Sequence, residues 1–426
     1  MSPSAFTIKE HVIPCQHIRE YHGAVKGNAA LQLAIKQYTP HDHGKTSPNA
    51  VTIIAAHANG VPKECYEPLW EDLLETLNIP IKSIWIADCS HQGASGVLNE
   101  SVQGDEPNWF DHSRDLLHMV NHFRDQIMQP IIGVAHSFSC SQLVHLSLMH
   151  PSLFHSLVFM EPMIQKENPS RLQSAPQARF SSLRPDIWPS RVEAEAFLRS
   201  SPLFRKWDAR AVDNFLEFGL RPAPTELYPQ ASPPGAVTLT TTKAQEAWTF
   251  LRLYAFPSST DPCDPVETVV GKDLAREARE EDMNNRSYVT NCPWPCLAYE
   301  FLPYLRPSTL FLFGESSHIN RPARREDKLQ QTGTGLGGNG GVATGRVKAH
   351  VIQGTAHMLP LEKTSETAAH ISHWLEKEVR RFGFEEEFSK SYNSQKSECD
   401  GKALSATWME YMELPSGTKR TLKSSL

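Results

Sequence analysis

Ser137 stands where a short apolar run meets an amphipathic helical pattern, and this position is the strongest chemical signal in the sequence. The apolar run Ile131–His136 ends directly before Ser137, and the helical pattern begins directly after it. A sharp strand-to-helix turn exposes a serine oxygen above a sheet, where it can attack a carbonyl carbon. The residues flanking such a turn must be small, and Ala135 and Ser139 are small, although glycine is usual at both positions. We therefore predict that Ser137 is a catalytic nucleophile.

A nucleophilic serine also needs backbone donors for the negative charge that develops on the attacked oxygen. The helix predicted after Ser137 directs its free N–H groups toward the serine, so we expect the Phe138 N–H to be one donor. The second donor should come from the loop after an earlier strand, where residues 56–60 read AHANG. We expect the Asn59 N–H in this role, although Asn-Gly is equally typical of a simple turn.

His357 is the predicted general base for Ser137. It lies in GTAHMLP (Gly354–Pro360), between the last predicted strand and the last predicted helix. The chain order expected for a serine at such a turn is serine, then carboxylate, then histidine. Two carboxylates are candidates to orient the histidine, because Glu161 ends the run SLVFME and Glu315 ends TLFLFGE. Both lie at the carboxyl end of a strand and both obey the order, so the residues alone do not decide between them.

Short apolar strands that alternate with helical patterns must position these side chains. The strand-like runs are rich in Val, Ile and Phe, as expected of strands covered on both faces. They are Ala50–His57, Ile81–Asp88, Ile131–His136, Ser156–Glu161, Ser308–Glu315 and Val347–Gly354. Helical spacing follows over residues 109–127 and 368–382, and two leading segments, Phe6–Ile13 and Leu31–Tyr38, resemble an antiparallel pair. The alternation predicts an α/β fold with a mostly parallel sheet and helices on both faces.

The distribution of proline predicts how the 426 residues are divided. Of 31 prolines, 17 lie from Pro162 to Pro303, where they interrupt the α/β pattern. We therefore predict a core of residues 1–162 and 304–383 and an inserted, mainly helical lid of residues 163–303. The helical patterns in this lid cover Val192–Arg199 and Ala244–Tyr254. Residues 384–426 are polar with few apolar residues, and we expect a polar tail that lies on the surface or is partly disordered.

Composition excludes several classes of function. Lys+Arg total 42 against Asp+Glu 48, a net charge of −6, which is not the electrostatic footprint of a nucleic-acid-binding protein. No run approaches the ~18 apolar residues of a membrane span, and a secretory signal is not expected. Cys292 and Cys296 have no second pair nearby to complete a zinc site. The G-x-G-x-x-G at Gly333–Gly338 lacks a strand before it and a helix after it, so no metal or organic cofactor is predicted.

Several long segments give the sequence a family resemblance that runs almost end to end. They include IREYHG, VPKECYEPLW, NWFDHSRDLLHMVNHFRDQ, IIGVAHSFS, VFMEPMIQ and LGGNGGV. These segments resemble fungal α/β-hydrolases of secondary metabolism, a family that includes peroxisomal acyl-CoA hydrolases of mycophenolic acid biosynthesis and hydrolases of host-selective toxin biosynthesis. The resemblance implies the α/β-hydrolase fold and a serine hydrolase, of thioesterase or esterase type, that cleaves an acyl-CoA.

The resemblance also assigns the carboxylate of the site. The family carries an aspartate in D-P-x-I-Q after the strand that follows the nucleophile helix, and Glu161 occupies this position in EPMIQ. The implied catalytic set is Ser137, Glu161 and His357. One alternative is an acyltransferase or a cyclase that uses the same acyl-enzyme, and another is a non-catalytic binding protein on the same fold.

The resemblance and the last residues predict a location and partners. Ser424-Ser425-Leu426 resembles the peroxisomal signal S-K-L without its lysine, so we expect the peroxisome, with the cytoplasm as the alternative. The expected partners are an acyl-CoA substrate, the peroxisomal import receptor and a second copy of the chain in a homodimer.

Overall fold

The computed structural model describes residues 5–41, 50–167, 171–230, 233–255, 261, 263–265, 288–291, 293–396 and 402–413. The strands are β1 (Phe6–Pro14), β2 (Gln32–Pro40), β3 (Val51–Ala56), β4 (Ile81–Ala87), β5 (Ile131–His136), β6 (Ser156–Met160), β7 (Ile187–Trp188), β8 (Leu220–Pro222), β9 (Val237–Leu239), β10 (Arg252–Ala255), β11 (Tyr288–Asn291), β12 (Ser308–Gly314) and β13 (Val347–Ile352). The helices are α1 (Glu67–Thr76), α2 (Gly93–Leu98), α3 (Trp109–His122), α4 (Ser139–Met149), α5 (Arg171–Leu183), α6 (Arg191–Ser200), α7 (Ala209–Phe218), α8 (Lys243–Phe250), α12 (Trp294–Phe301), α13 (Pro322–Gln331), α14 (Leu359–Glu362), α15 (Thr364–Ser394) and α16 (Ala406–Glu413).

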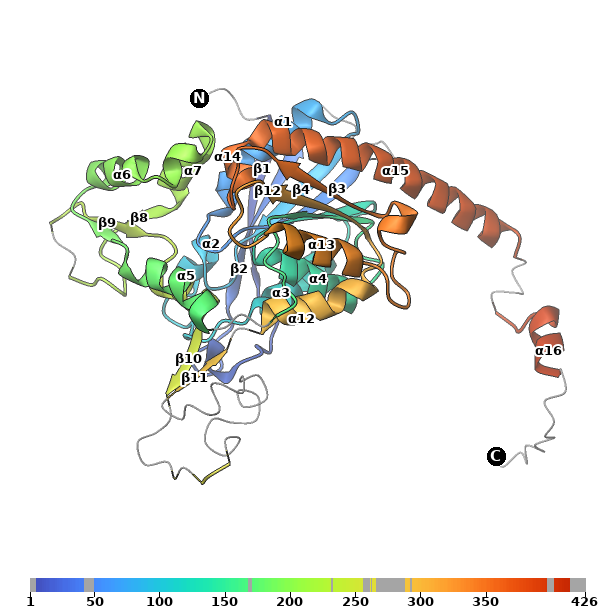
Figure 1. Ribbon diagram of the computed structural model, residues 1–426, viewed down its shortest axis with the longest axis horizontal. Coiled ribbons are helices and arrows are strands. Elements are labelled where there is room, and N and C mark those ends of the chain that lie inside the picture. Colours follow the sequence, from blue (N-terminus) through green and yellow to red (C-terminus); the bar gives the residue numbers. More distant parts are fainter. Residues whose placement is uncertain are drawn as a thin grey trace. The chain divides into compact units, whose positions relative to one another are not determined.

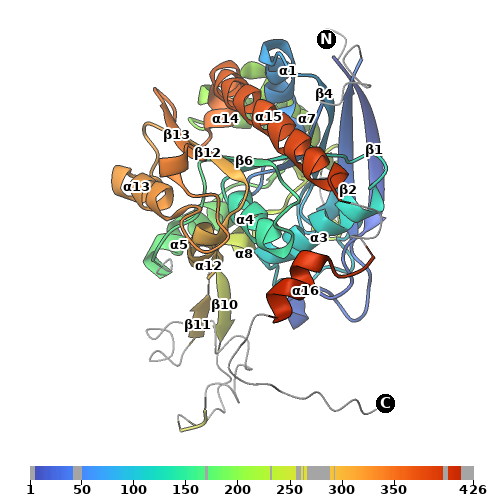
Figure 2. The same ribbon diagram turned by 90° about the vertical axis from the view of Figure 1, so that its right-hand side faces the viewer.

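The main sheet has eight strands in the order β1-β2-β4-β3-β5-β6-β12-β13. β2 pairs antiparallel with both β1 and β4, and the remaining neighbours run parallel. Every apolar run predicted as a strand lies in this sheet, and the two leading segments form its antiparallel edge (Figures 1 and 2). The predicted α/β fold with a mostly parallel sheet is therefore confirmed.

Alternate side chains of each central strand point to opposite faces of the sheet, and each face has its own apolar cluster. Ile53 of β3 packs in a cluster that includes α1 and the first part of α15, through residues such as Leu69 and Ile371. The next residue, Ile54, packs in a second cluster that includes α3 and α4, through residues such as Leu116. Because both faces are covered, the strands read as continuous apolar runs rather than as alternating patterns.

Two local expectations are wrong. β13 is the last strand of the sheet, and its middle residues are partly exposed rather than buried. Helix α8 ends at Phe250, and Arg252–Ala255 forms strand β10 instead of a further helical turn. Within the segment expected to be a polar tail, residues 384–394 continue α15 with exposed side chains, and α16 follows.

The segment between β6 and β12 contains more than the helices that were predicted for it. It includes α5 to α8, a small antiparallel sheet in the order β7-β9-β8, the hairpin β10–β11 and helix α12. Phe204, Trp207 and Phe215 of this segment are buried in the same cluster as α1 and the sheet. The proposed lid therefore shares one continuous apolar core with the strands that carry the site.

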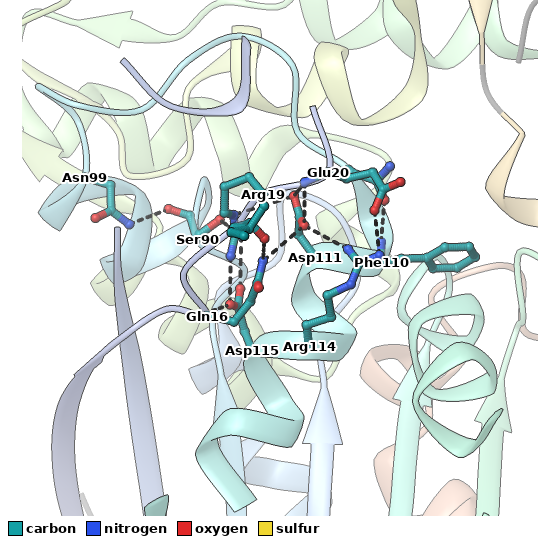
Figure 3. Close-up of polar contacts among 11 residues, drawn as sticks. Gln16, Arg19, Glu20, Ser90, Asn99, Phe110, Asp111, Arg114 and Asp115 are labelled. Carbon is teal, nitrogen blue, oxygen red and sulfur yellow. Dashed lines mark hydrogen bonds and ion pairs between the residues drawn. The ribbon is translucent and has the colours of Figure 1, made fainter. Parts of the chain in front are cut away.

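The loop between β1 and β2 is fastened to α3 by a buried ion pair (Figure 3). Nη1 and Nη2 of Arg19 lie 2.8 and 3.1 Å from the two carboxylate oxygens of Asp115, and the two side chains are 5% and 0% exposed. Asp111 accepts the backbone N–H of Glu20 at 3.0 Å. Burial raises the pKa of Asp111 to about 6, even though Arg19 acts in the opposite direction. The cluster therefore depends on Arg19 as the central cation.

We expect Arg19→Met to lower the free energy of unfolding by about 3–5 kcal/mol, because it leaves the Asp115 carboxylate buried without its cation. Urea unfolding measures this loss. The matched control is Arg199→Met, which removes the exposed ion pair with Asp213 and should cost no more than about 1 kcal/mol. Equal losses in the two variants would contradict the prediction.

Candidate active site

Ser137 occupies a tight turn between β5 and α4. Its backbone φ is 64°, in the left-handed region that costs free energy for a residue other than glycine. The Ser137 N–H donates to the carbonyl oxygen of Met160 at 2.9 Å, which ties the turn to the neighbouring strand β6. Ser139 Oγ lies 2.9 Å from the carbonyl oxygen of Ala56, so this serine joins the turn to β3 on the other side. The strained turn is thus fixed between two strands.

The structure brings Ser137, His357 and Glu161 together in one hydrogen-bonded chain. Ser137 Oγ lies 2.9 Å from His357 Nε2, and His357 Nδ1 lies 3.2 Å from Glu161 Oε2. Because the carboxylate can only accept, Nδ1 carries the proton and Nε2 accepts the serine hydroxyl. The three side chains follow β5, β13 and β6, so the carboxyl ends of parallel strands deliver them to one edge of the sheet.

Glu161 is fully buried and is surrounded by donors. Gly314 N–H donates to Oε1 at 2.7 Å, and Oε2 accepts from Ser317 Oγ at 2.5 Å and from Asn320 Nδ2 at 3.2 Å, in addition to His357. Burial alone would raise the pKa of Glu161. The hydrogen bond and charge of His357, with the bonds from Ser317 and Gly314, outweigh burial and hold this pKa below its usual value. Glu161 also has a positive φ of 49°, a backbone conformation that costs free energy for a residue other than glycine.

Glu315, the competing carboxylate, faces a different partner. Its Oε2 accepts the backbone N–H of Gly354 at 2.9 Å, and its side chain is exposed. Among the described residues, the carboxylate hydrogen-bonded to His357 is that of Glu161. Of the two carboxylates that the residue patterns left open, Glu161 is therefore the one in contact with His357, and its catalytic role stays a prediction.

The two N–H groups predicted to bind an oxyanion are both without an acceptor in the described part of the chain. Neither Phe138 N–H nor Asn59 N–H donates to a protein atom there. The Asn59 loop is nevertheless held firmly, because its side-chain Oδ1 accepts from Gln92 Nε2 at 2.6 Å and its Nδ2 donates to the carbonyl of Glu246 at 3.1 Å. A fixed loop with a free N–H is the arrangement that an oxyanion donor requires.

Ser137, His357 and Asn59 line one cavity of about 400 Å³. Most of its wall is apolar and comes from the segment between β6 and β12, including Phe204, Trp207 and Phe250. The cavity therefore has room for a large apolar group of a bound molecule beside Ser137. No group of three His, Cys, Asp or Glu in the described ranges could hold a metal ion, and none of the helices described there is long and apolar enough to cross a bilayer.

Comparison with known proteins shows where the chain belongs. It is 34% identical to the type I acyl-CoA thioesterase mpaH of Penicillium roqueforti over 98% of both chains. It is also 34% identical to mpaH' of Penicillium brevicompactum over 99% of this chain and 98% of that protein. The chain belongs to the mpaH family of α/β-hydrolases. The family resemblance predicted from the sequence is therefore confirmed.

Two more distant similarities concern a further fungal protein and a solved structure. The abhydrolase domain-containing protein AFT2-1 of Alternaria alternata is 25% identical over 59% of this chain and 85% of its own. The peroxisomal α/β-hydrolase Lpx1 of Saccharomyces cerevisiae has the same fold, with a TM-score of 0.64 and 16% identity over 92% of this chain and 99% of that chain. No protein-family model matches the chain.

Sequence reasoning missed several residues of this mpaH-family site. Ser317 and Asn320 donate to Glu161, yet they follow a different strand, β12. The polar run SSHIN could have indicated them, because it directly follows TLFLFGE, the strand that ends at the candidate carboxylate Glu315. Tyr66 and His136 were also overlooked, because a buried aromatic residue and a buried histidine are indistinguishable from core in a sequence.

Proposed function

We propose that the chain is a serine hydrolase that cleaves an acyl thioester, and that its substrate is an acyl-CoA formed in fungal secondary metabolism. The observation that carries the proposal is the Ser137–His357–Glu161 hydrogen-bonded chain, which opens into a large apolar cavity. The names of the 34% identical relatives, type I acyl-CoA thioesterases, support the thioester as the bond that is cleaved.

In the proposed first step, Ser137 Oγ attacks the thioester carbonyl carbon while His357 Nε2 takes the hydroxyl proton. The carbonyl oxygen becomes an oxyanion between the N–H groups of Phe138 and Asn59, which have no other acceptor in the described chain. The Glu161 carboxylate stabilises the imidazolium and keeps Nδ1 protonated. When the carbon–sulfur bond breaks, His357 gives its proton to the sulfur, and CoA leaves as a thiol.

The second step releases the acid from the enzyme. His357, now neutral, takes a proton from a water molecule, whose oxygen attacks the ester carbon of the acyl-enzyme. The bond to Ser137 Oγ breaks, the serine regains its proton from His357, and the free acid leaves. The same acyl-enzyme serves the alternative activity, in which an alcohol or amine replaces water, and the degree to which the lid excludes water decides between them.

We expect purified protein to release one CoA thiol and one free acid per acyl-CoA consumed, with bulky acyl groups preferred because the cavity is large and apolar. A thiol reagent measures the first product and mass spectrometry the second. Glycerol or hydroxylamine, added as competing acceptors, identifies a transferase if the acyl ester or hydroxamate replaces the acid. Absence of thiol release from every acyl-CoA tested, and of acid release from every ester tested, would contradict the hydrolase proposal and favour the non-catalytic binding protein.

The expected import tripeptide, Ser424-Ser425-Leu426, lies outside the described residues. Peroxisomal location, the import receptor and the homodimer stay predictions. The division into core, lid and tail also stays a proposal, in which the lid is an insertion that shares its apolar core with the sheet.

A further inference from the structure

Tyr66 and His136 form a buried chain of hydrogen bonds that connects two separate parts of the site. Ala58 N–H, in the predicted oxyanion loop, donates to Tyr66 Oη at 2.9 Å. Tyr66 Oη lies 2.7 Å from His136 Nδ1, and His136 Nε2 lies 2.9 Å from the backbone carbonyl oxygen of His357. Tyr66 is 1% exposed and His136 is fully buried. His136 also directly precedes Ser137.

The partners leave only one arrangement of protons in this chain. The carbonyl of His357 can only accept, so His136 Nε2 must carry a proton. Burial, together with the charge of His357, lowers the pKa of His136 to about 3, so the ring is neutral and its Nδ1 is an acceptor. Tyr66 O–H therefore donates to Nδ1, and its oxygen is free to accept Ala58 N–H. Every donor points in one direction, from the oxyanion loop to the backbone of His357.

We propose that Tyr66 and His136 are positioning residues. They hold the oxyanion loop and the His357 loop in fixed positions relative to Ser137. The proposal rests on the function proposed above. Tyr66 fixes the peptide next to Asn59, and His136 fixes the main chain of His357 itself, although neither side chain lines the cavity. A displacement of about 1 Å at either loop can lower a rate about 100-fold.

A purely structural role predicts a different result, and the chain offers a matched control. Tyr38 is also 1% exposed, and its hydroxyl donates at 2.9 Å to Glu67, which follows Tyr66 in sequence but takes no part in the hydrogen bonds from Ala58 to His357. Removing either hydroxyl should destabilise the fold by a similar amount, seen as a similar shift of the urea unfolding midpoint, because a buried polar partner is left unsatisfied. Only the Tyr66 hydroxyl should also affect the site.

The experiment compares Tyr66→Phe with Tyr38→Phe in the full chain. We expect Tyr66→Phe to lower kcat and the rate at which a fluorophosphonate labels Ser137 by about 10–100-fold, with KM nearly unchanged. Tyr38→Phe should stay within about twofold of the wild type in both rates. The labelling rate needs no knowledge of the substrate. If Tyr66→Phe retains the wild-type labelling rate and kcat while it loses stability, the positioning proposal is overturned.

His136 variants test the two halves of the chain separately. The amide of His136→Gln can still donate to the His357 carbonyl, whereas His136→Asn can still accept from Tyr66 but no longer reaches that carbonyl. We expect His136→Gln and His136→Asn each to slow the labelling of Ser137. Tyr66→Phe combined with His136→Gln should slow labelling no more than the larger of the two single changes, because Tyr66→Phe and His136→Gln break the same hydrogen bond. Additive losses would overturn the proposal. If the proposed function itself is wrong, Ser137 will resist labelling in the wild type as well. That result differs from failure of the positioning proposal, in which the wild type is labelled and the variants keep its rate.

Discussion

Ser137→Ala should lower kcat for thioester cleavage by about 10⁴- to 10⁶-fold, the scale of loss when the nucleophile of such a site is removed. The alanine leaves His357, Glu161 and the two free N–H groups in place, so substrate binding should change little. No other hydroxyl is within hydrogen-bonding distance of His357 Nε2 among the described residues, and none can replace Ser137. Thiol release from acyl-CoA under single-turnover conditions measures the loss, and mass spectrometry should detect no acyl-enzyme.

Ser147→Ala is the matched control for this prediction. Ser147 lies on the same helix, α4, is also buried, and donates its hydroxyl to the carbonyl of Leu143 at 2.8 Å. The same chemical change away from the site should leave kcat near the wild-type value. Turnover by Ser137→Ala at more than about 1% of the wild-type rate would mean that another residue carries the chemistry.

The parts of the fold that sequence patterns predict best are those where one physical requirement dominates. Strands covered on both faces must be apolar throughout, so β3, β4, β5, β6 and β12 were recognisable from composition and length. The turn at Ser137 was recognisable because a buried strand, small residues and a helix had to follow one another. Edge strand β13 and the end of α8 were misjudged, because β13 has a neighbouring strand on one side and Arg252–Ala255 pairs with the distant segment Tyr288–Asn291.

The arrangement around the site was harder to predict, because it depends on which strand ends meet in space. Glu161 and Glu315 have the same local pattern, and only the sheet order places β6 beside β5. The resemblance selected Glu161, while the geometry reaches the same residue through the contact with His357. The series of hydrogen bonds from Ala58 through Tyr66 and His136 to His357 joins separate segments, and no periodicity or motif connects these segments in the sequence.

The second large effect is expected for Glu161→Gln, which should lower kcat by about 10³- to 10⁴-fold. Four donors converge on this carboxylate, from Gly314, Ser317, Asn320 and His357. A glutamine offers one accepting oxygen and an NH₂ group, so at least one of these donors must face another donor. The neutral amide also removes the charge that stabilises protonated His357 during attack. The pH dependence of kcat and the rate of Ser137 labelling should both change.

Two further variants test whether the fall in kcat is specific to Glu161 or follows from the removal of any carboxylate at the end of a strand. Glu315→Gln makes the same change at the end of β12, where the carboxylate accepts only from Gly354 among the described residues, and it should leave kcat within about threefold of the wild type. Glu161→Asp keeps the charge but shortens the side chain by one methylene, so it should lose far less than Glu161→Gln. If Glu315→Gln abolished turnover while Glu161→Gln retained it, the carboxylate assignment would be reversed. Because the Glu161 carboxylate accepts hydrogen bonds from four partners, we expect the ordering Glu315→Gln, Glu161→Asp, Glu161→Gln from the smallest to the largest loss.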